Sequence, residues 1–166
     1  MVVSVNSLTD EELCQILEME RELFPDGLQD SYEKEIQKDR VAVLAYCPEG
    51  KVAGYVFSIP HSEAYSRLNE ADPQMLEMSN AQYIESVAIR KDLQGRGYFS
   101  KLMKTFLKEV EGSVVTMHAR ICNNCSSGMQ KHGAQHKHTV SNWFETGEDF
   151  DFLVMEKKKS SNSVDE

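Results

Sequence analysis

Apolar residues recur along this chain with two different periods, which separate its helices from its strands. Apolar positions three and four residues apart predict a helix that starts at the N-cap Thr9 and stops at Phe24, and another over residues 97–110. Shorter helices are expected over residues 31–38 and 124–132. We expect these helices to flank a sheet.

Short runs rich in valine, isoleucine and aromatic residues predict the strands of that sheet. The expected strands cover residues 41–46, 52–59, 83–89, 114–119, 139–144 and 150–155. The first two form a hairpin, and so do the last two. The order of the elements predicts an α/β fold (α+β in some schemes) with a mixed sheet of roughly six or seven strands.

A long, polar and irregular segment, residues 60–81, separates the second strand from the third. It is expected to contain helical turns over residues 62–68 and 73–78. Segments of this length without regular structure are uncommon and tend to be functional or mobile. Together with the final hairpin, this segment is expected to shape a binding site.

The composition is that of one ordinary globular domain, because 40% of the 166 residues are hydrophobic and 27% are charged. Residues 1–157 are expected to form this domain, and the polar residues 158–166 a disordered tail. The net charge of −9 disfavours nucleic acid and favours cationic partners, although acidity also simply keeps proteins in solution. No apolar run approaches the ~20 residues that span a bilayer, so we expect a cytoplasmic protein without membrane partners.

The segment from Tyr83 to Ser100 carries the most specific chemistry. A strand turns through Gln94-Gly95-Arg96-Gly97 and becomes a helix at once. Glycines let the backbone bend tightly and let a ligand approach it. The first turn of a helix has unpaired N–H groups at the positive end of its dipole, so this turn predicts an anion site suited to a pyrophosphate. The alternative is an ordinary strand–turn–helix unit that is packed for stability.

This segment resembles the signature of the GNAT superfamily of N-acetyltransferases. The superfamily has glutamine or arginine, two residues, glycine, one residue, then glycine or alanine, after a strand that ends in an apolar residue. Ile89, Gln94 and Gly97 match this pattern in type and spacing. The last position is Phe99, and a side chain of that size is expected to disturb the close packing of the turn but not its N–H groups. In element order the resemblance covers about Val3–Glu156.

The resemblance implies a mostly antiparallel sheet in which one strand splays from its neighbour at Ile89 to admit acetyl-CoA as co-substrate. The backbones of Val87 and Ile89 would pair with the pantetheine arm. The N–H groups of residues 95–100 would hold the pyrophosphate. The implied cofactor-binding residues are Val87, Ile89, Gln94, Gly95, Arg96, Gly97, Tyr98, Phe99 and Ser100.

Acyl transfer to an amine needs a base that accepts the ammonium proton. Glu85 is the candidate base, acting through a water molecule. Alternation along the strand predicts that it shares a face with Tyr83, Val87 and Ile89, where the thioester would lie. Polyamine acetyltransferases, which this sequence resembles here, have a glutamate at the matching position. The alternative is an ordinary surface or salt-bridged glutamate.

The leaving thiolate also needs a proton. The tyrosine that usually supplies it in the family is matched here by Met129, which cannot donate one. Tyr83, Tyr98 and Cys125 are the alternative donors, and water is another.

Cysteine and histidine gather in one stretch of the chain, as His118, Cys122, Cys125, His132, His136 and His138. Two cysteines three positions apart followed by histidines resemble a zinc site. The gap between Cys125 and His132 is, however, shorter than the ~12 residues usual in a zinc finger. We therefore expect no metal, and we expect free thiols rather than disulfides.

The resulting hypothesis is acetyl transfer from acetyl-CoA to a primary amine: a small amine or polyamine, a lysine side chain or a protein N-terminus. One alternative is a catalytically silent GNAT-fold protein that binds acetyl-CoA or a regulatory partner, which Met129 and Phe99 favour. A small zinc-binding adaptor is another. The amine, the acyl length and the oligomeric state stay open.

Overall fold

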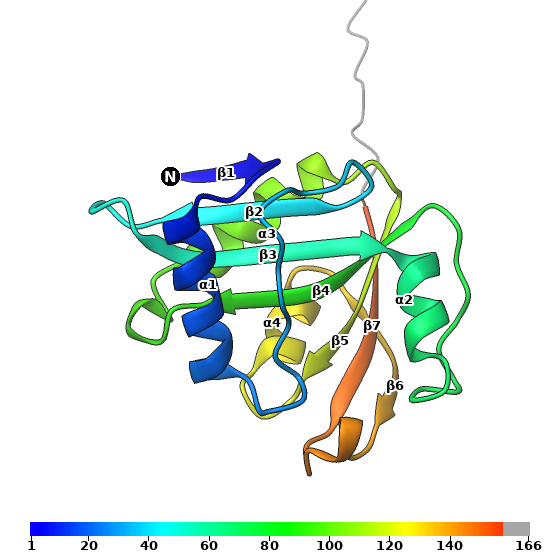
Figure 1. Cartoon of the computed structure of the whole chain (residues 1–166). Helices are drawn as coiled ribbons and strands as arrows, with labels where there is room; N and C mark the ends of the chain where they lie inside the picture. The colour runs from blue at the N-terminus through cyan, green and yellow to red at the C-terminus, as the bar shows by residue number, and fades with distance from the viewer. Residues whose placement is uncertain (158–166) are drawn as a thin grey trace, which may run out of the picture.

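The computed structural model describes residues 1–157 and shows a central sheet with helices on both faces (Figure 1). The strands are β1 (Val2–Val5), β2 (Val41–Tyr46), β3 (Val52–Pro60), β4 (Ala81–Ile89), β5 (Val114–Arg120), β6 (Gln135–Val140) and β7 (Phe150–Glu156). The helices are α1 (Asp10–Leu23), α2 (His61–Leu68), α3 (Tyr98–Glu109) and α4 (Cys125–Lys131), with 3-10 turns η1 (Lys91–Leu93) and η2 (Trp143–Glu145). The tail predicted over residues 158–166 lies outside the described residues. Within residues 1–157, no helix is long and apolar enough to cross a membrane.

The seven strands lie in the order β1-β2-β3-β4-β5-β7-β6. Throughout the described part of the chain, neighbouring strands are antiparallel except β4 and β5, which are parallel. This arrangement confirms the predicted fold class, a mixed and mostly antiparallel sheet with flanking helices.

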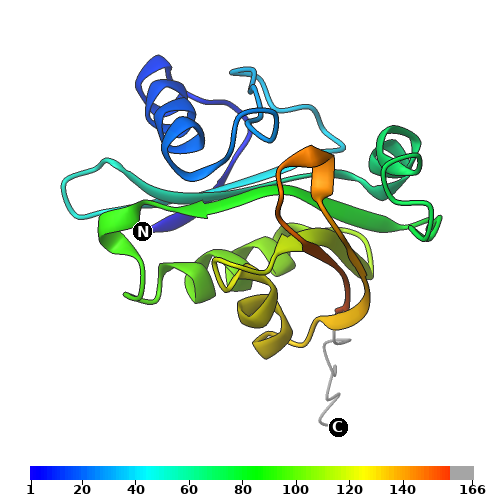
Figure 2. The same cartoon turned by 90° about the horizontal axis from the view of Figure 1, so that it is seen from below.

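The helices form a layer on each side of the sheet. Figure 2 shows α1 and α2 on one face and α3 and α4 on the other. Leu102 and Phe106 of α3 belong to one buried apolar cluster, and Ile16 and Met19 of α1 belong to a second. Because these positions are three or four residues apart, each helix turns one apolar face toward the sheet. The two long helices are therefore confirmed.

The start of α1 follows from its local sequence. The Thr9 hydroxyl accepts a hydrogen bond from the Glu12 N–H at 3.1 Å, and the Glu12 carboxylate accepts one from the Thr9 N–H at 2.9 Å. This reciprocal pair satisfies two N–H groups that the helix leaves unbonded. The predicted N-cap at Thr9 is confirmed.

The strands β4 and β5 separate soon after they meet. Their parallel pairing ends at Tyr83, opposite Thr116, whereas β4 continues to Ile89 with β3 as its partner. The opening therefore begins just beyond Tyr83, earlier than the splay predicted at Ile89. It leaves the β5-facing edge of β4 without a strand partner over residues 84–89.

A bulge interrupts β4 at the candidate base. Phe57 of β3 is opposite Ser86, and the next residue, Ser58, is opposite Ile84, so Glu85 is the extra residue on β4. An extra residue shifts the alternation of side chains between the two faces of the sheet. Faces predicted across this point by strict alternation are therefore unreliable.

The chain between α1 and β2 is irregular, so the helix predicted over residues 31–38 is wrong. Its backbone bonds to the N-terminal segment instead: the Leu8 N–H donates to the Lys34 carbonyl at 2.7 Å, and the Ile36 N–H donates to the Asn6 carbonyl at 3.0 Å. The Ile36 side chain packs against the cluster beneath α1. Tertiary packing of these apolar positions has outweighed their helical spacing.

Other boundaries also differ from the predictions. The strand β1 was not predicted, and of the two helical turns in the long segment only the one over residues 62–68 forms, as α2. The strand β6 ends before the predicted range 139–144 is complete. Asn142 and Phe144 have φ values of 50° and 48°, which a strand cannot contain.

Gly54 in β3 has no room for a side chain. An added Cβ would lie 2.7 Å from the Ala88 carbonyl oxygen and 3.1 Å from Leu102. We expect Gly54→Ala to lower the free energy of unfolding by about 2 kcal/mol, measured by urea denaturation. The control is Gly128→Ala in α4, where the Cβ would meet the Phe99 ring at 3.5 Å, an ordinary contact. It should be neutral or stabilising by up to about 1 kcal/mol, and equal losses in both variants would contradict the prediction.

Candidate active site

A pocket of about 680 Å³ lies where β4 leads into α3. Its walls come from the end of β4, the glycine turn, the first turn of α3, the start of α4 and the end of α1. The residues predicted to bind the cofactor that line it are Val87, Ile89, Gln94, Gly95, Gly97, Tyr98, Phe99 and Ser100. Arg96 is exposed and is not among the lining residues. The structure therefore gathers the predicted residues, apart from Arg96, around one cavity.

The glycine turn is shaped for an anion. Gly95 and Gly97 have φ values of 78° and 86°, in the left-handed region that favours glycine. Gly97 caps α3 without a side-chain hydrogen bond, and the first turn of α3 contains no acidic residue. The N–H groups at this end of α3 are thus free to bind a negatively charged group.

Two contacts hold the turn in place. The Gln94 side-chain amide donates to the Ile89 carbonyl at 3.1 Å, which ties the turn to the end of β4. The Phe99 ring packs on α4, beside Gly128 and with its centroid 5.5 Å from that of the His132 ring. The Phe99 side chain is thus accommodated by turning toward α4, where it packs beside Gly128 and His132.

Met129, at the usual position of the proton donor, and the alternative donors differ in where they lie. Met129 is buried in the core and does not line the pocket. Tyr98 and Cys125 do line it, and burial raises the pKa of the Cys125 thiol to about 11.

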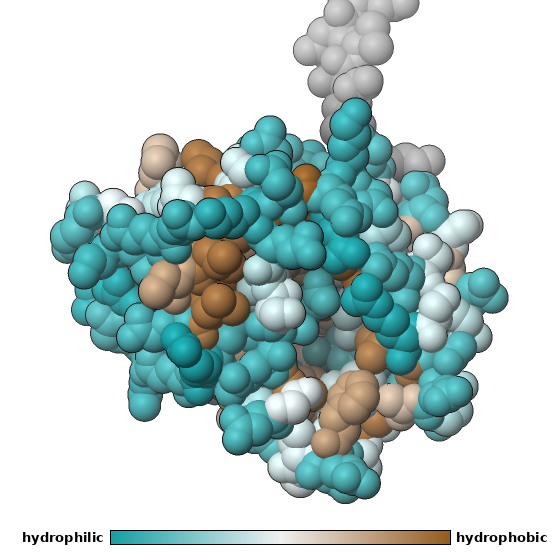
Figure 3. Space-filling view, viewed as in Figure 1, coloured by the Kyte–Doolittle hydropathy of each residue, from teal (hydrophilic) through white to brown (hydrophobic). Residues whose placement is uncertain are grey.

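Glu85 lies on the opposite face of the sheet. It lines a pocket of about 460 Å³ together with Asp30 and Arg67, and Figure 3 shows that this face is hollowed between the helices. Val87 and Ile89 pack against the cluster beneath α3. The prediction that Glu85 shares a face with them is therefore wrong, because the bulge shifts the alternation.

A second carboxylate lies beneath this pocket. Glu20 of α1 is 1% exposed. Its carboxylate accepts hydrogen bonds from the hydroxyls of Tyr55 at 2.6 Å, Ser86 at 2.9 Å and Tyr32 at 3.0 Å. The Asp30 N–H adds a fourth bond at 3.1 Å. A buried carboxylate needs such a set of donors. Here the donors come from β3, from β4 and from the loop that follows α1.

Negative charge accumulates around the pocket. Burial, followed by the charges of Glu85 and Glu20, raises the pKa of Asp30 to about 7. Burial also raises the pKa of Glu85, against the lowering effects of Arg40 and Arg67. A cation that entered the pocket would therefore be attracted to carboxylates that crowd one another.

A buried network of polar side chains lies where β4 and β5 separate. The Tyr83 hydroxyl donates to Nδ1 of His118 at 2.8 Å, and Nε2 of His118 donates to Asp72 at 2.8 Å. Nε2 of His138 lies 2.7 Å from the same Asp72 oxygen. The Trp143 ring stacks on His118, with the centroids 4.3 Å apart.

The network contains an ionised carboxylate and a neutral imidazole. Burial by itself would raise the pKa of Asp72, but the hydrogen bonds from the two histidines outweigh it and hold that pKa below its usual value. Burial lowers the pKa of His118 to about 4. Asp72 lies in the long segment between α2 and β4. Its contacts with the two histidines therefore hold this segment against β5 and β6. Neither Tyr83 nor His118 lines the two pockets.

The cysteine–histidine stretch does not form one site. Cys122 donates to Glu148 at 3.0 Å, whereas Cys125 faces the cavity beside α3, and all four cysteines are free, as predicted. Among residues 1–157, no group of three or more histidine, cysteine, aspartate or glutamate side chains is placed to hold a metal ion.

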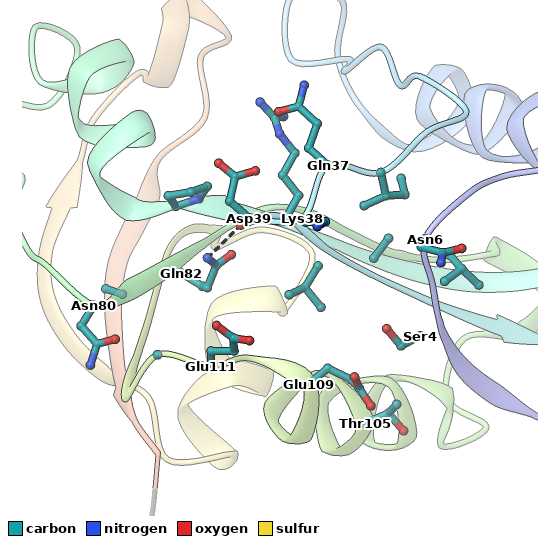
Figure 4. Close-up of a pocket in the computed structure, with 18 of the residues that line it drawn as sticks. Ser4, Asn6, Gln37, Lys38, Asp39, Asn80, Gln82, Thr105, Glu109 and Glu111 are labelled. Atoms are coloured by element: carbon teal, nitrogen blue, oxygen red, sulfur yellow. Dashed lines mark hydrogen bonds between the residues drawn. The ribbon is translucent and has the colours of Figure 1, made fainter.

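A third and larger groove, of about 1550 Å³, lies at the far end of the sheet (Figure 4). Its walls include Asp39 and Gln82, and the Gln82 side chain donates to the Asp39 carbonyl at 3.1 Å. They also include Glu109, the last residue of α3, and Glu111 just beyond it. No residue of the glycine turn lines it, nor does Glu85. Size alone does not make it the better candidate, because it gathers none of the groups that acyl transfer needs.

Sequence reasoning missed the partners of Glu85 and of Tyr83. The sequence predicts only a short helix around Arg67 and an irregular segment around Asp72. The spacing of Glu63 and Arg67, four residues apart, indicated an ion pair on a helix. No sequence signal connected Asp72 with His118, because their contact joins distant parts of the chain.

Comparison with known proteins identifies the family. The family model described as the acetyltransferase (GNAT) family matches residues 11–127. No curated protein sequence matches the chain.

Many solved structures share the fold. The ribosomal-protein-S18-alanine N-acetyltransferase of Escherichia coli has a TM-score of 0.65 at 13% identity, covering 99% of both chains. Arabidopsis thaliana NAA60 in complex with acetyl-CoA has a TM-score of 0.67 at 15% identity, covering 95% of this chain and 100% of that one. An aminoglycoside 6'-N-acetyltransferase complexed with coenzyme A has a TM-score of 0.64 at 10% identity, covering 94% and 96%. At these identities the likeness establishes the fold alone.

The buried imidazole of His118 makes stability depend on pH. The unfolded chain binds a proton there near pH 6.5, its ordinary pKa, and the folded chain only near about 4. The unfolded state therefore holds more protons between these values, so the free energy of unfolding should fall as the pH is lowered through this window, by roughly 2 kcal/mol.

Urea denaturation of wild type and His118→Gln at pH 6.5, 5.5 and 4.5 measures this effect. The variant should lose much of the pH dependence, whereas His132→Gln, at an exposed position, should keep it. Parallel pH curves for wild type and His118→Gln would contradict the assignment.

Proposed function

The chain belongs to the GNAT acetyltransferase family, and from this premise we propose that it transfers the acetyl group of acetyl-CoA directly to a primary amine. The observation that carries the proposal is the position of β4 between two pockets. Val87 lines the pocket of the glycine turn, and Glu85, two residues earlier, lines the acidic pocket on the opposite face. We propose that the thioester arm passes from one pocket to the other at this point, where β4 and β5 are no longer paired.

The cavity beside α3 suits acetyl-CoA. The N–H groups at the start of α3 face a space with no acidic side chain in the first turn, as a diphosphate requires. The edge of β4 beyond Tyr83 has no strand partner, so backbone groups around Val87 and Ile89 are left to pair with the amides of the pantetheine arm. When bound, acetyl-CoA supplies the activated acetyl group.

On the other face, Glu85 acts as the general base. The amine nitrogen attacks the thioester carbonyl, the carbon–sulfur bond breaks, and the ammonium proton passes through a water molecule to the Glu85 carboxylate. Burial of Glu85 raises its pKa, which brings the carboxylate closer to the value that suits a base at neutral pH.

Few groups are placed to donate a proton to the departing thiolate. Burial raises the pKa of the Cys125 thiol to about 11, so this thiol gives up its proton less readily than an exposed thiol of pKa ~8.5. The Tyr83 hydroxyl is engaged with His118 and lines neither pocket. Tyr98 and Cys125, which both line the cavity beside α3, and water are left as candidate donors.

The acceptor is a cationic amine: a small amine or polyamine, a lysine side chain or a protein N-terminus. The carboxylates of Glu85 and Asp30, which line one pocket, and of Glu20, which is buried next to Asp30, support a positively charged acceptor. The similar structures named above are enzymes for a ribosomal-protein alanine and for aminoglycosides. Both acceptor types are amines.

A specific observation favours one alternative, a catalytically silent protein that binds acetyl-CoA. The residue at the usual position of the proton donor, Met129, is buried in the core rather than merely different in type. Release of free thiol from acetyl-CoA over a panel of amines separates the two functions. Binding without turnover on a polyamine, a lysine peptide or a free N-terminal peptide would favour the silent protein.

The glycine turn should control cofactor affinity. Gly97→Ala places a side chain at a φ of 86°, which costs about 1 kcal/mol and disturbs the N–H groups beside the diphosphate. We expect the dissociation constant for acetyl-CoA, measured by calorimetry, to rise about tenfold. Gly50→Ala, at a φ of 85° in the β2–β3 turn, should cost similar stability without changing that constant. Equal affinities in both variants would contradict the site.

Glu85 should control chemistry rather than cofactor binding. In Glu85→Gln the side chain keeps its size but loses its basicity, so kcat should fall about 100-fold while the affinity for acetyl-CoA is unchanged. Glu111→Gln, which removes one carboxylate beyond α3, is the control for net charge and should keep full activity. An unchanged kcat in Glu85→Gln would rule Glu85 out as the base.

A further inference from the structure

Arg67 links Glu85, the candidate base, to the carboxylate of Glu63. This arginine lies on α2, and its Nη2 is 2.6 Å from the Glu63 carboxylate on the same helix. Its other terminal nitrogen, Nη1, is 3.8 Å from Glu85 on β4. Arg40, from the segment before β2, also bonds Glu63, at 2.9 Å and 3.3 Å. Glu63 thus holds two arginines in place, and one of them reaches the base.

We propose that Arg67 is a positioning residue of the active site, which keeps the Glu85 carboxylate ionised and oriented, with Glu63 setting how strongly it does so. This inference rests on the proposed function, because it assigns a role around the same base. It concerns the free protein, however, and can be measured without any substrate.

The sign of each influence on Glu85 follows from the charges that face it. Arg67 on α2 and Arg40 before β2 stabilise the carboxylate and lower its pKa. Glu63 on α2 and Glu20 on α1 repel the Glu85 carboxylate and raise its pKa. Asp30, in the loop after α1, is coupled to Glu85 in the same repulsive sense. Burial is the largest influence and raises the pKa of Glu85, so the two arginines act against burial and repulsion to keep the carboxylate ionised.

Glu63 limits the contact between Arg67 and Glu85. The Arg67–Glu63 distance is 2.6 Å, whereas the Arg67–Glu85 distance is 3.8 Å, so the arginine is directed mainly at the helix partner. Removing the Glu63 charge would act twice in the same direction. It would remove a repulsion from Glu85, and it would release Arg67 to approach Glu85 more closely.

The rival interpretation is an ordinary pair of oppositely charged residues four positions apart on a helix. Such surface pairs contribute only ~0.3–0.5 kcal/mol and have no other role. In that case Arg67 and Glu63 would affect α2 alike, and neither would change the proton affinity of Glu85 in a particular direction.

Carboxyl carbon NMR of protein labelled at its glutamates tests the proposal, with Glu85→Gln used to assign the Glu85 resonance. In Arg67→Gln the pKa of Glu85 should rise by about half a unit, a modest shift because the Arg67 side chain is 52% exposed to solvent. In Glu63→Gln the pKa of Glu85 should fall. Arg67→Lys keeps the positive charge and should leave the pKa close to that of wild type.

Opposite shifts in Arg67→Gln and Glu63→Gln establish the proposal, because loosening α2 would not give opposite signs. No shift in Arg67→Gln, or a shift in the same direction in both variants, would overturn it. Amide spectra of each variant check that the fold is kept.

The pH profile of acetyl transfer separates this proposal from the proposed function. If Glu85 is the base, the acidic limb of kcat/KM should move to higher pH in Arg67→Gln and to lower pH in Glu63→Gln. NMR shifts of the expected signs in a protein whose Glu85→Gln variant stays fully active would keep the Arg67 inference and reject Glu85 as the base. The reverse result would keep the base and reject Arg67.

Discussion

The separation of β4 from β5 is the constraint on which the rest of this structure depends. Hydroxyls of the last pair before the opening are each held by a histidine: Tyr83 by His118 at 2.8 Å, and Thr116 by His61 at 2.6 Å. Beyond this point the backbone of β4 has no strand partner on that side, and backbone groups left unpaired need water or a ligand. The two pockets lie on either side of this opening, so one feature of strand pairing organises both.

The same opening places opposite electrostatic environments on the two faces. On the α3 face, the glycine turn presents backbone N–H groups to an anion without an acidic side chain nearby in the helix. On the α1 face, Glu20, Asp30 and Glu85 crowd together and are only partly balanced by arginines. An acyl transfer from a negatively charged donor to a positively charged acceptor needs this separation, because each substrate is then attracted to its own side.

Local sequence predicted the elements whose cause is local. The capping box at Thr9, the left-handed glycines at 95 and 97 and the apolar face of α3 all follow from residues close in sequence. The extended course of residues 31–38 follows instead from hydrogen bonds to the N-terminal segment, and the bulge at Glu85 from the register with β3. For the same reason the residues of the glycine turn and the end of β4, which line one cavity, could be grouped from the sequence, whereas the face of Glu85 and its contact with Arg67 could not.

The most direct test of this account is a crystal structure with acetyl-CoA bound. We expect the diphosphate at the N–H groups of residues 97–100 and the pantetheine arm along the free edge of β4. We expect the thioester beside Glu85, with one water molecule between the thioester and the Glu85 carboxylate. A cofactor in the groove of Figure 4, or an acetyl group on the α3 face away from Glu85, would contradict it.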